Sequence, residues 1–118
     1  NRVLMVTDTY TPDFNAHDFY ADITNEVTGT GYTAGGELLT TTEITLSGGV
    51  LTFDAADVAW TTSTIANAMA GVLKTTVSGS ATDQLILLSD FVTAASSSGG
   101  TFTIQWSASG IATVDYVP

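Results

Sequence analysis

The single histidine of the chain stands among aspartates. His17 lies between Asp13 and Asp18, and Asp22 follows four residues later. A histidine beside carboxylates suits a general base that an acid holds in orientation, and it equally suits one ligand of a divalent metal ion. A catalytic base also needs a nucleophile or an electrophile nearby, and no such motif accompanies His17. We therefore interpret His17 as a polar residue on a solvated face, and we expect no enzyme.

The carboxylates offer a second route to chemistry. Asp18, Asp22 and Glu26 recur every four residues, so a helix would align their like charges in one row. A calcium ion or a basic neighbouring protein would relieve the repulsion, but the spacing matches no EF-hand loop, and a solvated face is the simpler interpretation. Asp54 and Asp57 flank a predicted turn, where hydrogen bonds to the local backbone account for them. A glycosidase needs a carboxylate pair, yet no other feature of the sequence supports one. We predict no catalytic residue, metal ion or cofactor.

The composition limits the class of partner. The length of 118 residues, with 44% hydrophobic content, predicts a single domain over residues 1–118. Only 2 Lys and Arg accompany 12 Asp and Glu, and such an acidic surface is repelled by phosphate backbones and anionic membranes. No apolar run reaches a bilayer span, and cysteine is absent, which rules out disulfides and thiolate metal sites. We predict no nucleic-acid partner and no membrane association.

The residues before position 37 are predicted to form a strand, a helix and a glycine-rich turn. Residues 2–7 are apolar and β-branched, which indicates a strand buried on both faces. Asp13 or Asn15 can cap an amphipathic helix over residues 16–25, which would lie as a lid over the sheet. The glycines of residues 29–36 indicate a turn, because glycine adopts positive φ values readily. A phosphate-binding loop is a poor interpretation, because no Lys-Ser/Thr follows these glycines.

The rest of the chain has the two-residue period of strands. Threonine, at 22 positions, favours the solvent face of a sheet. Residues 65–73 are ambiguous between helix and strand, and we interpret them as a strand with alanines packed in tight space. The predicted strands here are 43–46 and 50–54 (a hairpin around Ser47-Gly48-Gly49), 58–60, 65–73, 85–91 (central), 101–106 (Phe102, Ile104 and Trp106 inward) and 111–117, with a loop at 94–100. The pattern predicts a mainly β fold, an antiparallel β-sandwich or small barrel of about eight strands with one short helix near the N-terminus.

Aromatic residues gather in the first third of the chain. Such side chains either bury into the core or form an anchoring patch for another protein or a sugar. They are Tyr10, Phe14, Phe19, Tyr20 and Tyr32. Burial is the simpler interpretation, and any member left exposed is a candidate for binding.

Several motifs along the chain resemble those of one family. They are YTPD at Tyr10–Asp13, HDF at His17–Phe19, NEVTGTGYTAGG at Asn25–Gly36, TFDAADVAWT at Thr52–Thr61 and TFTIQWSASGI at Thr101–Ile111. Together they are similar to a group of small tailed-phage virion proteins, described as structural, minor capsid or head decoration proteins. The chain departs from that group after Trp60, where relatives tend to carry aromatic or charged residues and this sequence has small ones around Ala68.

The resemblance implies a non-enzymatic structural protein of the bacteriophage virion. It implies a capsid decoration (cement) protein that binds and stabilises the outer capsid surface, with the major capsid protein and copies of itself as partners. The expected contact residues with capsid or neighbouring subunit are Tyr10, Pro12, Phe14, Phe19, Tyr20 and Tyr32. Two alternatives stay open, a tail or neck fibre component and a carbohydrate-binding adhesion module.

Overall fold

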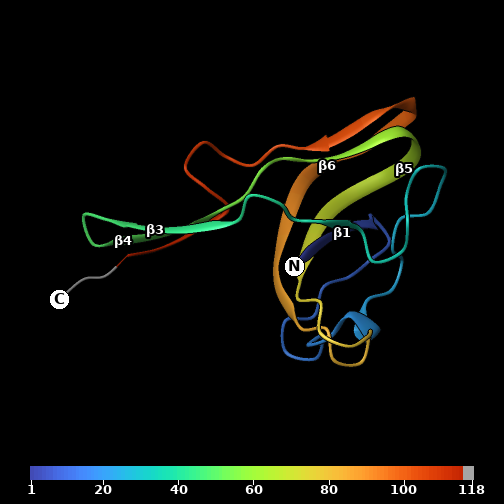
Figure 1. Cartoon of the computed structure of the whole chain (residues 1–118). Coiled ribbons are helices and arrows are strands. Elements are labelled where there is room, and N and C mark those ends of the chain that lie inside the picture. The colour runs from blue at the N-terminus through green and yellow to red at the C-terminus, as the bar shows by residue number, and fades with distance from the viewer. Residues whose placement is uncertain (116–118) are drawn as a thin grey trace.

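The fold is mainly β and consists of two antiparallel sheets (Figure 1). The computed structural model describes residues 1–115. One sheet has the strand order β2-β1-β5-β6, and the other has the order β3-β4-β7. The strands are β1 (Arg2–Thr7), β2 (Glu37–Leu38), β3 (Glu43–Ser47), β4 (Val50–Asp54), β5 (Val58–Lys74), β6 (Leu85–Ile104) and β7 (Ala112–Asp115). The predicted mainly β, antiparallel class is confirmed, with seven strands in the described residues.

The larger sheet, which we call the body together with the loops that cover it, is built on one long hairpin. Strands β5 and β6 contain 17 and 20 residues and pair with several register shifts. At most of these shifts one strand has one extra residue, and between Ala68 and Ala70 the partner strand β6 has three. The strands therefore bend, and the hairpin curves back over β1 (Figure 1). Val3 and Met5 face one hydrophobic cluster, and Leu4 and Val6 face another. The prediction that residues 2–7 are buried on both faces is therefore confirmed.

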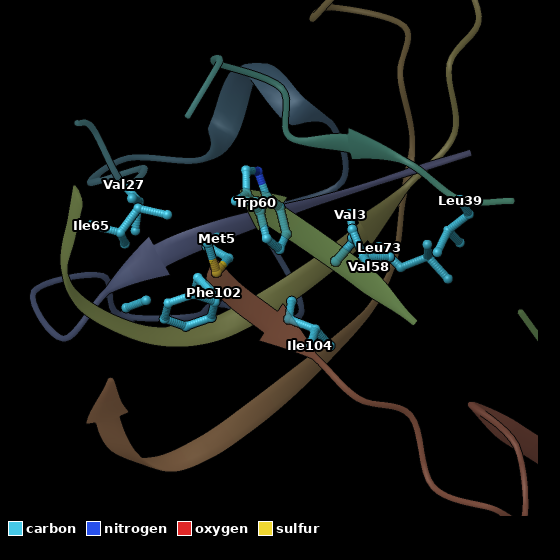
Figure 2. Packing of buried hydrophobic residues seen from close by; sticks show 11 residues of the cluster. Val3, Met5, Val27, Leu39, Val58, Trp60, Ile65, Leu73, Phe102 and Ile104 are labelled. Atoms are coloured by element: carbon cyan, nitrogen blue, oxygen red, sulfur yellow. The ribbon is translucent and has the colours of Figure 1, made fainter. Parts of the chain in front are cut away.

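The first cluster is the main core, and Trp60 is its largest buried side chain (Figure 2). The indole ring stacks on Tyr32 with 5.9 Å between ring centroids and meets the edge of Phe102 at 6.2 Å. Both halves of β5 contribute, because Ile65 from the first half and Leu73 from the second join the same cluster. The bent hairpin therefore encloses its own core.

The predicted helix over residues 16–25 is wrong in extent. Only a single 3-10 turn forms there, η1 (Tyr20–Asp22). The Asp22 carboxylate accepts hydrogen bonds from the backbone N–H groups of Asp18 and Phe19, both at 3.0 Å. Because this side chain satisfies donors that the predicted helix would have left free at its first turn, the segment stays compact without a helix. It still covers the second face of β1, as the predicted lid would.

The serine-rich stretch was assigned to the wrong element. The predicted central strand 85–91 and the predicted loop 94–100 both lie in β6, which is the edge strand of its sheet. The hydroxyl groups of Ser63 and Ser97 lie 2.8 Å apart, and Ser97 also donates to the Ser63 carbonyl. These side-chain bonds hold the two strands together where the register shifts, so the polar residues remain in the sheet.

The other predicted strands lie within strands of the structure, although 58–60 and 65–73 form one strand, β5, and the predicted inward residue Trp106 is half-buried beyond the end of β6. Residues 65–73 lie in β5, which confirms the strand interpretation, although the register shift leaves Ala66 exposed while Ala68 is buried. Phe102 and Ile104 are buried as predicted. Strand β7 covers part of the predicted segment 111–117, whose residues 116 and 117 lie outside the described residues.

The smaller sheet extends away from the body, and we call it the arm (Figure 1). Its β3–β4 hairpin confirms the prediction around Ser47-Gly48-Gly49. Ser47 pairs with Val50, so the turn consists of Gly48 and Gly49, whose φ values of 58° and 79° are those of a type I′ turn. Three segments join the arm to the body, residues 39–42 between β2 and β3, residues 55–57 between β4 and β5, and residues 105–111 between β6 and β7.

Candidate interaction surfaces

The arm has one wholly apolar face. Residues directly opposite each other in adjacent strands point to the same side of a sheet, and residues two apart in one strand do so as well. The pairs Ile44 with Phe53, Leu46 with Leu51, Leu51 with Val114, and Phe53 with Ala112 define that side. We call it the apolar arm face, and its residues are Ile44, Leu46, Leu51, Phe53, Ala112 and Val114.

This face is open over most of its extent. The exposed fractions are 66% for Ile44, 71% for Leu46, 42% for Leu51 and 65% for Val114. Phe53 is the exception, because it packs against the main core at the base of the arm. Leucine and valine side chains scattered singly on a surface are ordinary, but a contiguous set on one sheet face marks an interaction site.

The opposite face of the arm carries its charges. Glu43, Asp54 and Asp115 lie there, together with threonines such as Thr45 and Thr52. This face is polar apart from Val50, so the arm is an amphipathic sheet of the kind that normally covers a core. Residues 1–115 supply no such cover for the apolar side outside its base.

A second exposed apolar surface lies on the segment between β1 and η1. Phe14 is 80% exposed, Pro12 is exposed beside it in sequence, and Ile86 of β6 is 50% exposed. These three residues line a cavity of about 220 Å³ together with Tyr10 and His17. We call this surface the Phe14 patch, and it contains two of the six predicted contact residues, Pro12 and Phe14. A third, Tyr10, lines the cavity but is buried.

His17 has a local structural role. Its Nδ1 atom accepts hydrogen bonds from the Tyr10 hydroxyl at 2.7 Å and from the Asp13 backbone N–H at 3.3 Å. Asp13 in turn accepts hydrogen bonds from the N–H groups of Asn15 and Ala16, which forms a capped turn. Burial, followed by the nearby carboxylates of Asp22 and Asp13, raises the pKa of Tyr10. His17 therefore fixes the shape of the segment that presents Phe14.

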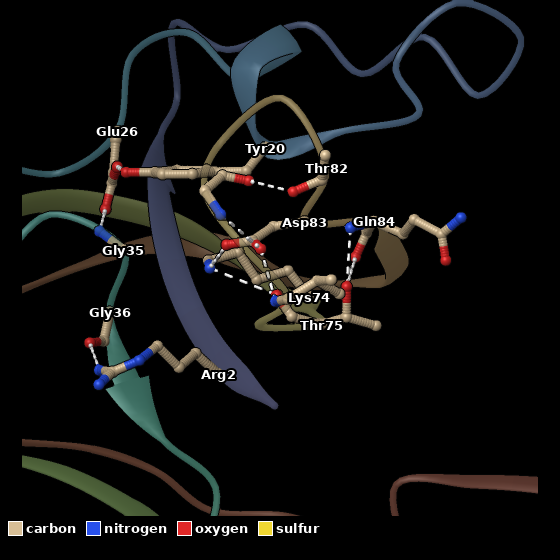
Figure 3. Close-up of polar contacts among 12 residues, drawn as sticks. Arg2, Tyr20, Glu26, Gly35, Gly36, Lys74, Thr75, Thr82, Asp83 and Gln84 are labelled. Carbon is tan, nitrogen blue, oxygen red and sulfur yellow. Dashed lines mark hydrogen bonds and ion pairs between the residues drawn. The ribbon is translucent and has the colours of Figure 1, made fainter.

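The remaining predicted contact residues serve the interior or its edge. The Glu26 carboxylate accepts hydrogen bonds from the Tyr20 hydroxyl at 2.5 Å and the Gly35 N–H at 2.8 Å (Figure 3). It also accepts one from the Tyr32 hydroxyl at 2.7 Å. Burial and then the bond to Glu26 raise the pKa of Tyr20 to about 12 and raise that of Tyr32 further. Phe19 is half-buried and pairs its backbone with Gln84.

Both cationic side chains of the chain are bound within the body (Figure 3). The Arg2 guanidinium donates to the Gly36 carbonyl at 2.9 Å. The Lys74 Nζ lies 2.7 Å from the Asp83 carboxylate and 4.9 Å from the centre of the Tyr20 ring. The hydrogen bond from Lys74, with two from backbone N–H groups, lowers the pKa of Asp83 to about 2. The surface of this acidic protein is therefore left without a free Lys or Arg.

A groove runs along β6 where the chain leaves the body for the arm. Its volume is about 460 Å³, and its lining includes Phe91, Phe102, Trp106 and Ile111. The Trp106 indole N–H donates to the Ala56 carbonyl at 3.1 Å, which fixes the ring at the rim. Aromatic walls of this kind suit an apolar segment or the face of a sugar ring.

The acidic residues do not assemble into a metal site in the part of the chain that the structure describes. Within residues 1–115 no group of three His, Cys, Asp or Glu side chains converges, because Glu26 turns to the tyrosines and Asp22 to the backbone. No helix among these residues is both long and apolar enough to span a membrane. Comparison of the chain with protein-family models, curated proteins and solved structures finds no match.

The apolar arm face was missed by sequence reasoning, although its signal is present. The alternation of Ile44, Leu46, Leu51 and Phe53 predicts the β-hairpin over residues 43–54. Alternation predicts which side chains share a face, and it does not say whether another part of the chain covers that face. Among the predicted contact residues, Pro12 and Phe14 lie on an open surface, and their contact with another protein stays a prediction.

Proposed function

We propose that this chain is a non-enzymatic virion protein that binds the outside of a phage capsid and stabilises it, as a decoration or cement protein. One observation carries the proposal: two exposed apolar surfaces, the apolar arm face and the Phe14 patch, lie on different elements of one small chain. A protein with two such surfaces can contact two neighbours at once, which is what a cement protein does.

The motif resemblance to tailed-phage virion proteins supports this function. The hydrogen bonds of His17, Asp22 and Glu26 support the non-enzymatic part of the proposal, because all three side chains bond to groups of the fold itself. The Phe14 patch is the proposed contact with the major capsid protein. Exposed aromatic side chains are typical anchors of protein interfaces, where they fill pockets of the partner.

Rebinding to particles that lack the protein tests this proposal. Wild-type protein should bind such particles at saturable sites, and Phe14→Ser should weaken binding at least tenfold, as expected for an aromatic anchor. Val92→Ser is the matched control, because it also replaces an exposed apolar side chain, 78% exposed on β6. The φ of 69° at Val92 is unfavourable for a β-branched residue, so serine should be tolerated there and capsid binding should stay unchanged. Absence of any saturable binding by the wild type would contradict the capsid role.

The alternatives predict different results. A tail or neck fibre component would appear in cryo-electron microscopy of the intact particle as density away from the capsid shell. A carbohydrate-binding adhesion module is favoured by the groove that Phe91 and Trp106 line. Binding on a glycan panel that disappears in Trp106→Ala would replace the capsid proposal with this one.

A further inference from the structure

The apolar arm face has the form of one half of a β-sandwich. In a sandwich, two sheets pack their apolar faces about 10 Å apart, and polar residues alternate outward. The arm shows that alternation in three strands, with Ile44, Leu46 and Leu51 among the residues of the inward kind. Residues 1–115 contain no second sheet opposite this face.

We infer that a second copy of this chain supplies the missing sheet, so that the apolar arm faces of two copies pack against each other. The contact is isologous, meaning that the same residues of each copy meet around a two-fold axis. The contact specifies the second of the two neighbours in the proposed function, and it rests on that function only for its place in the virion.

Charge favours a second copy over a basic partner protein. The chain carries a net charge of −10, so copies repel wherever their carboxylates would meet. The apolar arm face carries no charged residue, and Glu43, Asp54 and Asp115 all lie on the opposite face. Two arms that pack face to face therefore keep these carboxylates on the outside. A basic partner would instead be matched by carboxylates within the contact face, as complementary interfaces are.

The size of the face sets the strength of the contact. Burial of the exposed side chains on two copies removes on the order of 1,000 Å² from water, which is the lower limit for a specific protein interface. Such a pair associates reversibly in solution. A capsid lattice that holds neighbouring copies close would raise their effective concentration and favour the paired state.

Sedimentation of the purified protein over a range of concentrations and salt tests the inference. The wild type should shift from monomer to dimer, and raising the salt should strengthen the dimer, because it screens the repulsion between acidic chains. The double variant Leu46→Thr, Val114→Thr should raise the dissociation constant at least tenfold. Val50→Thr on the opposite face of the same sheet makes the same kind of change and should leave the constant unaltered. An unchanged constant in the double variant would overturn the inference.

Single cysteines test the face-to-face geometry, since the chain contains none of its own. Leu51 lies on the middle strand of the arm, and Thr52 is the next residue on the opposite face. Under mild oxidation, Leu51→Cys should form a disulfide-linked dimer many times faster than Thr52→Cys. Equal rates, or a protein that stays monomeric at millimolar concentration, would overturn the second-copy inference. Neither result depends on whether the capsid role itself is correct, because the rebinding experiment with Phe14→Ser tests that role separately.

Discussion

The two sheets of this protein use the same kinds of residue for different ends. In the body, β1 is buried on both sides, since the curved β5–β6 hairpin covers one face and the segment around η1 covers the other. In the arm, an equally apolar face stays open along most of its length. The comparison shows that alternation creates an apolar face, whereas the path of the rest of the chain decides whether that face stabilises the fold or remains available for a partner.

The energetic difference between the two sheets is large. Burial of a leucine side chain contributes about 1.5–3 kcal/mol of transfer free energy. Leu4 and Leu73 are fully buried and contribute this free energy within the monomer. Leu46 is 71% exposed, so most of its transfer free energy would be gained only if another molecule buried it. The same difference should be measurable in the backbone, in the side chains and in the response to pH.

The largest effect should come from paired glycine substitutions. Gly36→Ala in the body would place a Cβ 1.9 Å from the Val3 carbonyl oxygen, at a backbone φ of 79°. The turn before β2, which contains Gly36, would therefore have to move away from β1. We expect a loss of more than about 4 kcal/mol, which is the range of severe structural disruption. Gly48→Ala at the tip of the arm has a similar φ of 58° with no atom within 4 Å, and it should cost only about 1–2 kcal/mol.

Urea denaturation of the two variants makes this measurement. Gly48→Ala acts as the control for backbone strain, because both sites have the left-handed conformation and only one is crowded. Equal losses in the two proteins would mean that the turn before β2 is not tied to β1 as the structure shows.

A pair of leucine truncations should give the next largest difference. Leu73→Ala removes a fully buried side chain from the main core and should cost about 2–5 kcal/mol. Leu46→Ala makes the same chemical change on the arm and should alter monomer stability by less than about 0.5 kcal/mol. The measurement is urea denaturation at a concentration low enough to keep the protein monomeric. Burial of one or two methyl groups contributes on the order of 1 kcal/mol to the free energy of unfolding. A loss larger than this in Leu46→Ala at that dilution would show that the arm face is covered within the monomer.

The sequence predicted the fold best where the local pattern is strong. The buried strand at Arg2–Thr7 and the hairpin around Gly48 follow from β-branched alternation and from turn chemistry, which act over a few residues. The helix prediction failed because the Asp22 side chain caps its own preceding backbone and ends the segment in one turn. The Ser97 region failed because serine hydroxyls bond across the irregular ladder, which is a contact 34 residues apart in sequence.

The candidate surfaces were predictable only in part, for a related reason. Phe14 stands out in the sequence as an aromatic residue next to a proline turn, and it is exposed. Tyr20 and Tyr32 belong to the same aromatic cluster, but the Glu26 carboxylate binds both of their hydroxyl groups. Which aromatic residues are held by a partly buried acid depends on the path of the whole chain, and composition does not contain that information.

The response to acid should give the smallest and most specific difference between body and arm. The Lys74–Asp83 ion pair belongs to the body, and its two side chains are 4% and 6% exposed. The pKa of Asp83 is lowered from 3.8 to about 2, chiefly by the hydrogen bond from Lys74. A carboxylate with a lowered folded-state pKa contributes stability that is complete above its ordinary pKa and is lost as the pH falls through the folded value.

Asp83→Asn should therefore lower the melting temperature most at pH 7, and the difference from wild type should shrink between about pH 4 and pH 2. Glu43→Gln, which changes an exposed carboxylate on β3 of the arm, is the control and should give a small difference. If the deficit of Asp83→Asn is the same at pH 2 as at pH 7, the ionised pair does not stabilise the body, and its stability must then come from the apolar clusters alone.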